Sequence, residues 1–507
     1  MSRKNVTSRD VLPSDLAIST KERYQQNLKH AKQLLADYQL HDSKAVTRFK
    51  ENHPQGNDLN FVPTLQDARL IISGKSVRLK RFSFEKLKKE AKDLLRALKT
   101  NESEAVVRLE YHPKGLRDVN VLKLADAQCI IAGENGFVSW AKLKTHFSEI
   151  CLAQEHIHSP RLKLDHDLKT LHVRCGTDIQ SALKTCGFSG EFLEISNPFP
   201  EGRVPPFDPI DNFVNVRGDF IVQNYGADVP PEFSDRIKHA YDEIRDVENK
   251  LRSLPQNCER IVLWFEHDPF DQLCLAYVLA HLVNINLGNC LLELIQIDRF
   301  PGIKKFIGIG YLCEHPENLI LLWQQRERIS STMTAFGTRF WSAFTTDNPT
   351  ELWQLSQEQC FPIMRQAMLR MLKELPWTTN GLSLTEQLAL EIIDRDGPIN
   401  MAKTFHFLNT ESEPMSFLGD IMFLSVMRLL WQDSMVLKVI GSDANESPML
   451  RETVEITATG RELIRGQHNW LKIGDPRYKR WVGNVRVSNS GKQWYWCPEK
   501  DRPVLIK

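Results

Sequence analysis

The chain has 507 residues, of which 42% are hydrophobic and 25% are charged, so it is expected to fold as a globular protein with more than one core. This composition excludes a disordered chain, and no apolar run is long enough to cross a membrane. The formal net charge is +1, but residues 1–150 hold 27 Lys and Arg against 18 Asp and Glu. That asymmetry predicts attraction between the two parts or an acidic partner, although a solvated helical face gives the same pattern.

Cysteine usage and the first residues favour a cytoplasmic location. The ten cysteines are scattered without a Cys-x-x-Cys pair, which is typical of reduced thiols and not of a disulfide or zinc framework. The first ten residues lack the apolar core of a signal peptide. Residues 1–24 are polar and aperiodic, so we expect a disordered tail there.

Residues 25–155 contain an internal repeat with a period of about 60 residues. In each copy a helical apolar pattern leads to a His-Pro step, at His53-Pro54 and at His112-Pro113. Leu65-Gln-Asp-Ala68 in the first copy then matches Leu124-Ala-Asp-Ala127 in the second. The pattern predicts two stacked helical hairpins, an all-α surface suited to a protein partner.

Short apolar segments alternate with helical ones in residues 165–312. This alternation predicts an α/β domain built on a Rossmann-like parallel sheet. Residues 313–380 are expected to form a helical extension of that domain. The expected strands are 171–175, 192–196, 260–266 and 291–297, and the expected helices are 179–185, 231–254 and 271–284.

Residues 381–507 have a third pattern. A helix that starts at Leu384 with Thr385 as a cap precedes helices near 400–408 and 417–432. A strand, a glycine turn and a helix follow at 454–464, which together predict a winged-helix-like domain. Arg428 is the only basic residue of the third helix, so nucleic acid is not expected to be read through base contacts.

The last residues are basic and aromatic. Arg477-Tyr-Lys-Arg480 lies close to Trp481, Trp494 and Trp496. Tryptophans beside basic residues can stack on single-stranded nucleic acid. They more often fill a small β core, and we favour that interpretation.

Polar residues follow the end of each expected strand of the α/β domain. Because parallel strands end at one edge of a sheet, these residues should line a shared crevice at a topological switch point. We predict a site there for a small anionic ligand, such as a nucleotide or another phosphate-bearing molecule. Its expected ligand-binding residues are Gly176, Thr177, Asp178, Asn197, Gln272, Asp298 and Arg299.

Basic and backbone groups in this set could hold an anion. The turn from Gly176 to Asp178 could offer backbone N–H groups to a phosphate, or it could simply cap a helix. Arg299 could grip a phosphate in a bidentate manner or pair with Asp298. Lys304 and Lys305 add positive charge in a glycine-rich loop that could close over the ligand.

The group Glu266, His267, Asp268 and Asp271 has three interpretations. Carboxylates with an imidazole can bind a divalent metal that activates water. Without metal, His267 or Glu266 can act as the general base of a hydrolase or transferase. Alternatively the group is a structural network in which Asp268 or Asp271 caps the next helix. The sequence leaves open whether the chain is an enzyme, a ligand-binding protein or an interaction scaffold, and which cofactor or metal it needs.

Eight segments carry a resemblance to a known family: Leu171–Asp178, Asn197–Gly202, Leu263–Leu273, Phe306–Gly310, Leu382–Glu386, Phe417–Asp420, Ile456–Gly460 and Arg480–Gly483. Residues 168–500 resemble the domain-of-unknown-function 1835 family and the C-terminal region usually found with it. The second repeat copy is similar to a helical repeat of bacterial proteins, which implies a bacterial source and a scaffolding role. Asn197 and Arg203 depart from the family pattern, which has Asp and Pro there, so a base or metal ligand at 197 would be missing.

Overall fold

This computed structural model describes twelve segments of the chain, which fall into two compact units, Met1–Ala97 and Leu98–Lys507. The expected tail at 1–24 and most of the first repeat copy lie outside the described residues. The described segments are 33–34, 36–38, 44–46, 84–112, 121–158, 163–226, 229, 234–303, 306–431, 435–443, 451–474 and 479–506.

The described part of the repeat region is helical. In the second unit, Arg108 forms a two-pronged ion pair with Glu134, with both N···O distances at 2.6 Å. This pair fastens the turn η1 onto helix α6. Stacking of the two repeat copies stays a prediction. The elements are α4 (Phe84–Lys99), α5 (Ser103–Val107), η1 (Arg108–Tyr111), α6 (Leu124–Glu134) and α7 (Trp140–His158).

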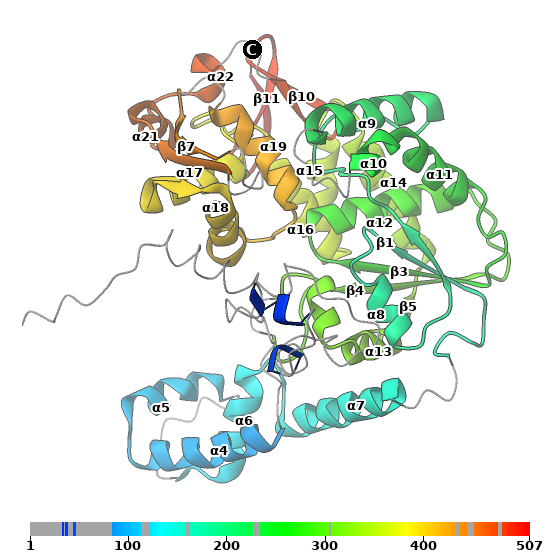
Figure 1. Cartoon of the computed structure of the whole chain (residues 1–507), viewed down its shortest axis with the longest axis vertical. Coiled ribbons are helices and arrows are strands. Elements are labelled where there is room, and N and C mark those ends of the chain that lie inside the picture. Colours follow the sequence, from blue (N-terminus) through cyan, green and yellow to red (C-terminus); the bar gives the residue numbers. More distant parts are fainter. Residues whose placement is uncertain are drawn as a thin grey trace, which may run out of the picture. The chain divides into compact units, whose positions relative to one another are not determined.

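A five-stranded sheet organises the α/β region (Figure 1). The first four strands pair in parallel, as predicted, and the short β5 is antiparallel to β4. The chain winds outward from β1 in both directions, so its topological switch point lies between β1 and β3. The strand order is β2 (Glu191–Glu194), β1 (Thr170–Arg174), β3 (Arg260–Glu266), β4 (Leu291–Ile297) and β5 (Glu327–Arg328).

Helices cover both faces of this sheet. Ile261, Leu263 and Phe265 of β3 enter one core, while Val262 and Trp264 enter the other. This two-sided burial explains why β3 is a continuous apolar run and not an alternating one. The first core contains α9 (Ile210–Tyr225), α11 (Ala240–Arg252), α12 (Pro269–Leu282) and α14 (Ser331–Phe344), and the second contains α8 (Gln180–Thr185), η4 (Gly310–Glu314) and α13 (Glu317–Gln324).

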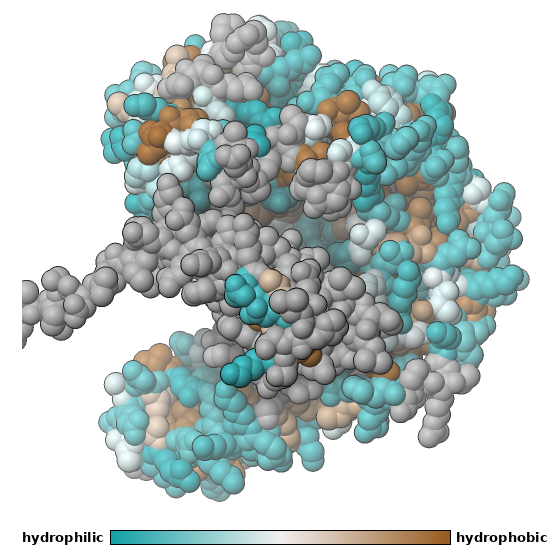
Figure 2. All heavy atoms as spheres, in the orientation of Figure 1, coloured by the Kyte–Doolittle hydropathy of each residue, from teal (hydrophilic) through white to brown (hydrophobic). Residues whose placement is uncertain are grey.

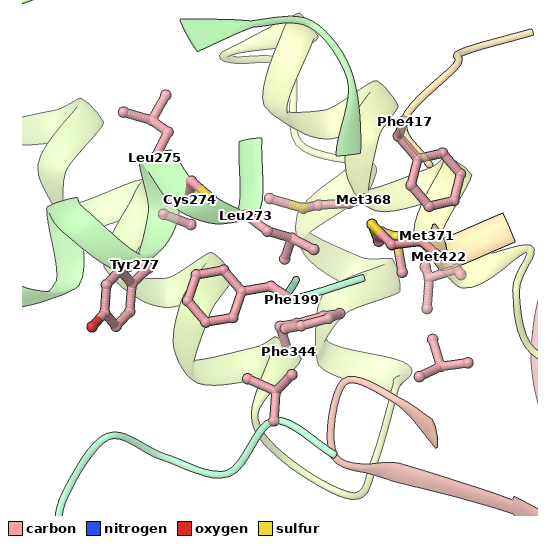
Figure 3. Close-up of a cluster of buried hydrophobic side chains, with 14 of the residues drawn as sticks. Phe199, Leu273, Cys274, Leu275, Tyr277, Phe344, Met368, Met371, Phe417 and Met422 are labelled. Atoms are coloured by element: carbon pink, nitrogen blue, oxygen red, sulfur yellow. The ribbon is translucent and has the colours of Figure 1, made fainter. Parts of the chain in front are cut away.

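The first core continues from the sheet into the C-terminal region. Figure 3 shows Phe199 and Leu273 close to Met368 and Met371 of α16, with Met422 beyond them. The α/β region and the C-terminal region are therefore joined by one continuous apolar core. The remaining helices of this part are α10 (Ser234–Lys238), α15 (Thr350–Ser356) and α16 (Pro362–Leu372), and residues 231–233 of the helix expected at 231–254 lie outside the described residues.

The C-terminal region begins with helices near the predicted positions. The first has Ser383 as its N-cap, because the Ser383 hydroxyl accepts from Glu386 N at 3.1 Å and the Glu386 carboxylate accepts from Ser383 N. The prediction of Thr385 as the cap was wrong, since its hydroxyl bonds to Glu374 at 2.8 Å instead. The helices are α17 (Leu384–Asp396), α18 (Met401–Phe407) with the π-helical turn η5 (Leu408–Ser412), α19 (Asp420–Trp431), α21 (Ala458–Ile464) and α22 (Trp470–Ile473).

Three small sheets complete this region. Trp496 is buried, as expected for a β core, whereas Trp481 and Trp494 are half-buried. Arg477 and Tyr478 of the basic tail lie outside the described residues. The three-stranded sheet is ordered β6 (Ile399–Asn400), β8 (Glu452–Ile456), β7 (Leu437–Ser442), and the hairpins are β9 (Lys479–Val482) with β10 (Val485–Ser488) and β11 (Gln493–Cys497) with β12 (Arg502–Ile506).

Figure 2 shows one face of the molecule, on which hydrophilic side chains cover most of the described surface and hydrophobic ones are scattered. Among the described residues, none of the helices is both long enough and apolar enough to span a membrane.

A buried carboxylate joins α11 to α12 and offers a test of the fold. Glu248 is fully buried and accepts hydrogen bonds from Tyr277 Oη at 2.6 Å, His281 Nε2 at 3.1 Å and Arg252 Nε at 3.0 Å. Glu248→Ala should lower the free energy of unfolding by about 3–5 kcal/mol, because three donors lose their acceptor. The control Glu191→Ala breaks an exposed pair with Lys250 and should cost less than about 1 kcal/mol. Urea denaturation compares the two; equal losses would contradict the buried network.

Candidate functional site

The candidate site lies at the carboxyl edge of the sheet, between β1 and β3. β1 ends at Arg174 and β3 ends at Glu266, and α12 starts three residues later at Pro269. Because the first four strands are parallel, the four polar turns predicted from sequence do lie along this one edge. Open α/β sheets bind their ligands at such a switch point.

The Arg174 guanidinium is at the centre of the site. Its side chain is only 2% exposed, and it contacts three carboxylates. Nε and Nη2 donate to the two oxygens of Asp178 at 3.1 and 2.9 Å, and Nη2 lies 3.4 Å from Glu266 Oε2. Nη1 donates to Asp271 and to the Trp264 carbonyl. Burial alone would lower the pKa of Arg174, but the surrounding acids raise this pKa well above its usual value.

Two aspartates fix the start of α12 beneath the site. Asp268 caps the helix, as one interpretation predicted, because its carboxylate accepts from Asp271 N at 3.1 Å. Asp271 accepts from Glu266 N at 2.7 Å and from the Cys175 thiol at 2.9 Å. The Asp271 carboxylate is therefore fully engaged with protein donors, whereas Asp268 uses only one oxygen in the cap.

Gln272 extends this arrangement toward β4. Its amide nitrogen donates to the Glu266 carbonyl, and its amide oxygen accepts from Gln296 Nε2 at 2.8 Å. The side chain thus holds the end of β3 in place, and because Gln272 is fully buried it is not accessible to a ligand.

A glycine-bearing loop lies directly on two of the carboxylates. Ile309 N donates to Glu266 Oε2. A Cβ atom added at Gly308 would come within 2.7 Å of Glu266 Oε1, and one added at Gly310 within 2.5 Å of Asp178 Oδ2. Gly308 also has a φ of 152°, which disfavours other residues. Lys304 and Lys305 of the same loop lie outside the described residues.

Burial gives these acids a high affinity for protons. Loss of hydration raises the pKa of Glu266 to about 7, and it raises the pKa of Asp268 well above its usual value. The pKa of Asp271 is also raised, mainly by burial. In the part of the chain that the structure describes, Glu266, Asp268 and Asp271 are the only acidic, histidine or cysteine group of three or more whose potential ligand atoms all lie within 4.8 Å.

His267 lies beside the carboxylate cluster. Its Nδ1 is buried and has no hydrogen-bond partner among the described residues. Its ring centroid lies 5.7 Å from that of Phe306, and burial lowers the pKa of the imidazole. Burial therefore favours the neutral form of the His267 imidazole.

The other predicted residues are not part of the cluster of Glu266, Asp268 and Asp271. Asp298 and Arg299 are 3.5 Å apart on the surface after β4, with side chains 46% and 88% exposed. Asn197 is buried after β2 and accepts from Arg217 Nε at 2.8 Å. Gly176 and Thr177 follow β1, but Asp178 turns its carboxylate to Arg174 and so disfavours an anion at this turn.

Sequence reasoning missed Arg174, Cys175 and the backbone N–H of Ile309. One signal for Arg174 was available, because a charged residue at the end of a buried strand needs counter-charges and five acids are expected at the same edge. Cys175 and Ile309 carry no such signal, since their roles depend on how the loops fold.

No family model matches the chain, and no curated protein or solved structure matches it. The resemblances to the domain-of-unknown-function 1835 family and to the bacterial helical repeat therefore stay predictions.

The raised pKa of Glu266 predicts a pH-dependent stability. Below about pH 4.5 the Glu266 carboxyl is protonated in both the folded and the unfolded protein. Above that pH it ionises first in the unfolded chain, so the contribution of Glu266 to the free energy of unfolding falls until about pH 7 and then levels off. The loss attributable to Glu266 should be on the order of 3 kcal/mol. Chemical denaturation from pH 4.5 to 8 in EDTA should show this fall in the wild type, and Glu266→Gln should remove that part of it. Glu191→Gln, an exposed control, should not; an unchanged slope in Glu266→Gln would contradict the raised pKa.

Proposed function

We propose that the carboxyl-edge cluster of Glu266, Asp268 and Asp271 binds a divalent cation such as Mg²⁺, and through it a small phosphate-bearing ligand such as a nucleotide. The observation that carries this proposal is the crowding of three buried carboxylates within 4.8 Å of one another at the switch point of the sheet. Hard cations take carboxylate oxygens, and Mg²⁺ in particular is commonly shared between one or two carboxylates and substrate phosphates.

Charge balance supports a cation. Arg174 is the only basic side chain with a described ion pair to these acids, whereas Asp178, Glu266, Asp268 and Asp271 are four carboxyl groups. Carboxylates without enough counter-charge are costly to bury, so they hold protons or take a cation. An anionic ligand placed directly against this edge would face like charge. A bound cation would reverse the sign of the local field and make a phosphate favourable.

The contacts suggest different roles for the acids. Glu266 and Asp268 would supply the ligand oxygens, because the Asp271 carboxylate already accepts from Arg174, from Glu266 N and from Cys175. Asp271 and Arg174 would position the other two. His267, with its buried Nδ1, would take up a proton from a water or a substrate hydroxyl near the cation. A bound divalent cation would supply Lewis-acid polarisation of the phosphate.

A hydrolase or transferase is the second candidate function. Its specific support is the pKa of Glu266, which at about 7 suits a general base that works near neutral pH. A reaction that proceeds in EDTA and is abolished in Glu266→Gln would favour this candidate over simple ligand binding.

The C-terminal region is proposed to be a winged-helix-like domain whose helix α19 packs against the α/β region. Its order of α17, β6, α18, α19, β7 and β8 is that of a winged helix, so we infer a winged-helix-like fold. Ile421 and Met422 of α19 line the same cavity as Ile221 and Tyr225 of α9. Helix α19, which would contact the bases of DNA in a DNA-binding winged helix, thus lies against the α/β region. A protein partner at residues 25–155, a cytoplasmic location and a bacterial source stay predictions.

Direct cation binding is the first test. Titration of the metal-free protein with Mn²⁺, followed by electron paramagnetic resonance, should show a site whose dissociation constant rises at least ten-fold in Glu266→Gln and in Asp268→Asn, because each loses a ligand oxygen. The matched control Glu191→Gln removes an acid that is exposed and pairs with Lys250, and it should leave binding unchanged. Equal Mn²⁺ affinity in wild type and Asp268→Asn would rule out the proposed site.

Dependence of ligand binding on the cation is the second test. A thermal-shift panel of nucleoside di- and triphosphates should raise the melting temperature in MgCl₂ but not in EDTA, because the phosphate is held through the cation. The shift should be larger at pH 8 than at pH 6, where protons compete for Glu266. A shift of equal size in EDTA would mean that the ligand binds elsewhere or without metal.

A further inference from the structure

A cavity lies near the same edge of the sheet, and we propose that it binds a small, neutral, largely apolar molecule that carries one hydrogen-bond acceptor. The cavity has a volume of about 280 Å³. It lies between helices α9, α11, α12 and α19 and is separate from the carboxylate cluster. The proposal does not depend on cation binding.

The walls of the cavity are apolar. Three residues of one face of α11, Ala240, Ile244 and Val247, form one side, because they follow the spacing of successive helical turns. Phe270 of α12 and Met422 of α19 contribute from the other elements. A buried water molecule needs two to four hydrogen-bond partners, and such a space offers few of them. The walls therefore favour an apolar occupant.

The size of the cavity limits the ligand. An engineered apolar cavity of about 150 Å³ is known to hold benzene. A cavity of about 280 Å³ therefore suits a two-ring aromatic system or an aliphatic chain of about ten carbons. Small-molecule pockets commonly lie where structural regions meet, as this one does.

Asn197 supplies the polar contact. Asn197 is one of the residues that line the cavity, and it is 8% exposed. Its carbonyl oxygen accepts from Arg217 Nε at 2.8 Å, and its amide nitrogen has no hydrogen bond to the described residues. The amide N–H groups can donate to a ketone, ester or similar oxygen of the ligand.

The charged residues at the cavity already have partners. Arg236 donates to Glu243 at 3.1 Å and lies 2.8 Å from Glu194. No described charge of the lining therefore calls for a counter-ion, which points to a neutral ligand. Phe270 stands between Asp268 and Asp271 in the first turn of α12, so an occupant of the cavity would touch the helix that carries the carboxylate cluster.

The experiment uses the full chain and prodan, a neutral naphthalene ketone whose emission shifts to the blue in apolar surroundings. Prodan should bind with a saturable blue shift. Ala240→Phe fills the cavity and should weaken binding at least ten-fold. Val222→Phe places the same side chain on α9 at a position that is 37% exposed, outside the lining, and should leave binding unchanged. Circular dichroism and thermal melting verify that each variant is folded; Val247→Phe replaces Ala240→Phe if that variant is not.

Asn197→Asp tests the hydrogen bond. Aspartate keeps the acceptor for Arg217 but removes the amide donors, so prodan affinity should fall about two- to ten-fold. N-phenylnaphthylamine has no carbonyl acceptor, and its affinity should stay the same. Absence of prodan binding, or binding that folded cavity-filling variants do not change, would overturn the proposal. A loss of both probes in Asn197→Asp would overturn the assigned hydrogen bond.

Discussion

The ion pairs of Arg174 are the constraint on which the carboxyl edge of the sheet depends. One buried guanidinium contacts Asp178 after β1, Glu266 at the end of β3 and Asp271 in α12, so it sets the relative positions of three segments. Removing it would leave Glu266 and Asp271 buried without a counter-charge, a far larger cost in stability than the loss of one surface pair. Buried ionic groups of this kind are weak evidence for stability, because well-packed apolar residues often serve as well. Their concentration at a switch point therefore favours a functional explanation over a purely structural one.

The sheet could be predicted from sequence because its pattern is local. The continuous apolar run of β3 indicated a strand covered on both faces, and alternating helices indicated parallel pairing, which together place four polar turns along one edge. The contents of the site depend on contacts that are distant in sequence and could not be predicted in the same way. Arg174 and Asp271 are 97 positions apart, and the sequence of neither segment indicates a contact with the other. Glu266 is the last residue of β3, and Asp298 and Arg299 directly follow β4, yet the side chains of Asp298 and Arg299 are exposed.

The C-terminal region shows a similar division between local and distant signals. The capping box of Ser383 and Glu386 follows the pattern Ser-x-x-Glu, so the start of α17 could be predicted from sequence, although Ser383 and not the predicted Thr385 is the N-cap. The packing of α19 against α9 could not be predicted from the sequence of either helix. A largely apolar helix with a single arginine indicates burial but does not specify its partner, and here the partner lies about two hundred residues earlier in the chain.

The carboxylate cluster and an anionic ligand are compatible only under particular conditions. Asp178 occupies the turn where a backbone phosphate site was expected, and Arg174 already has carboxylate partners, so neither is available to receive an anion directly. Protonation would relieve the repulsion, since burial raises the pKa of Glu266 to about 7, but protonated acids would no longer draw a cation to the site. A divalent cation, as proposed above, would resolve both difficulties, because it would displace those protons and present positive charge to a phosphate. The same buried acids that oppose an anion in the metal-free protein would then be the reason that one binds.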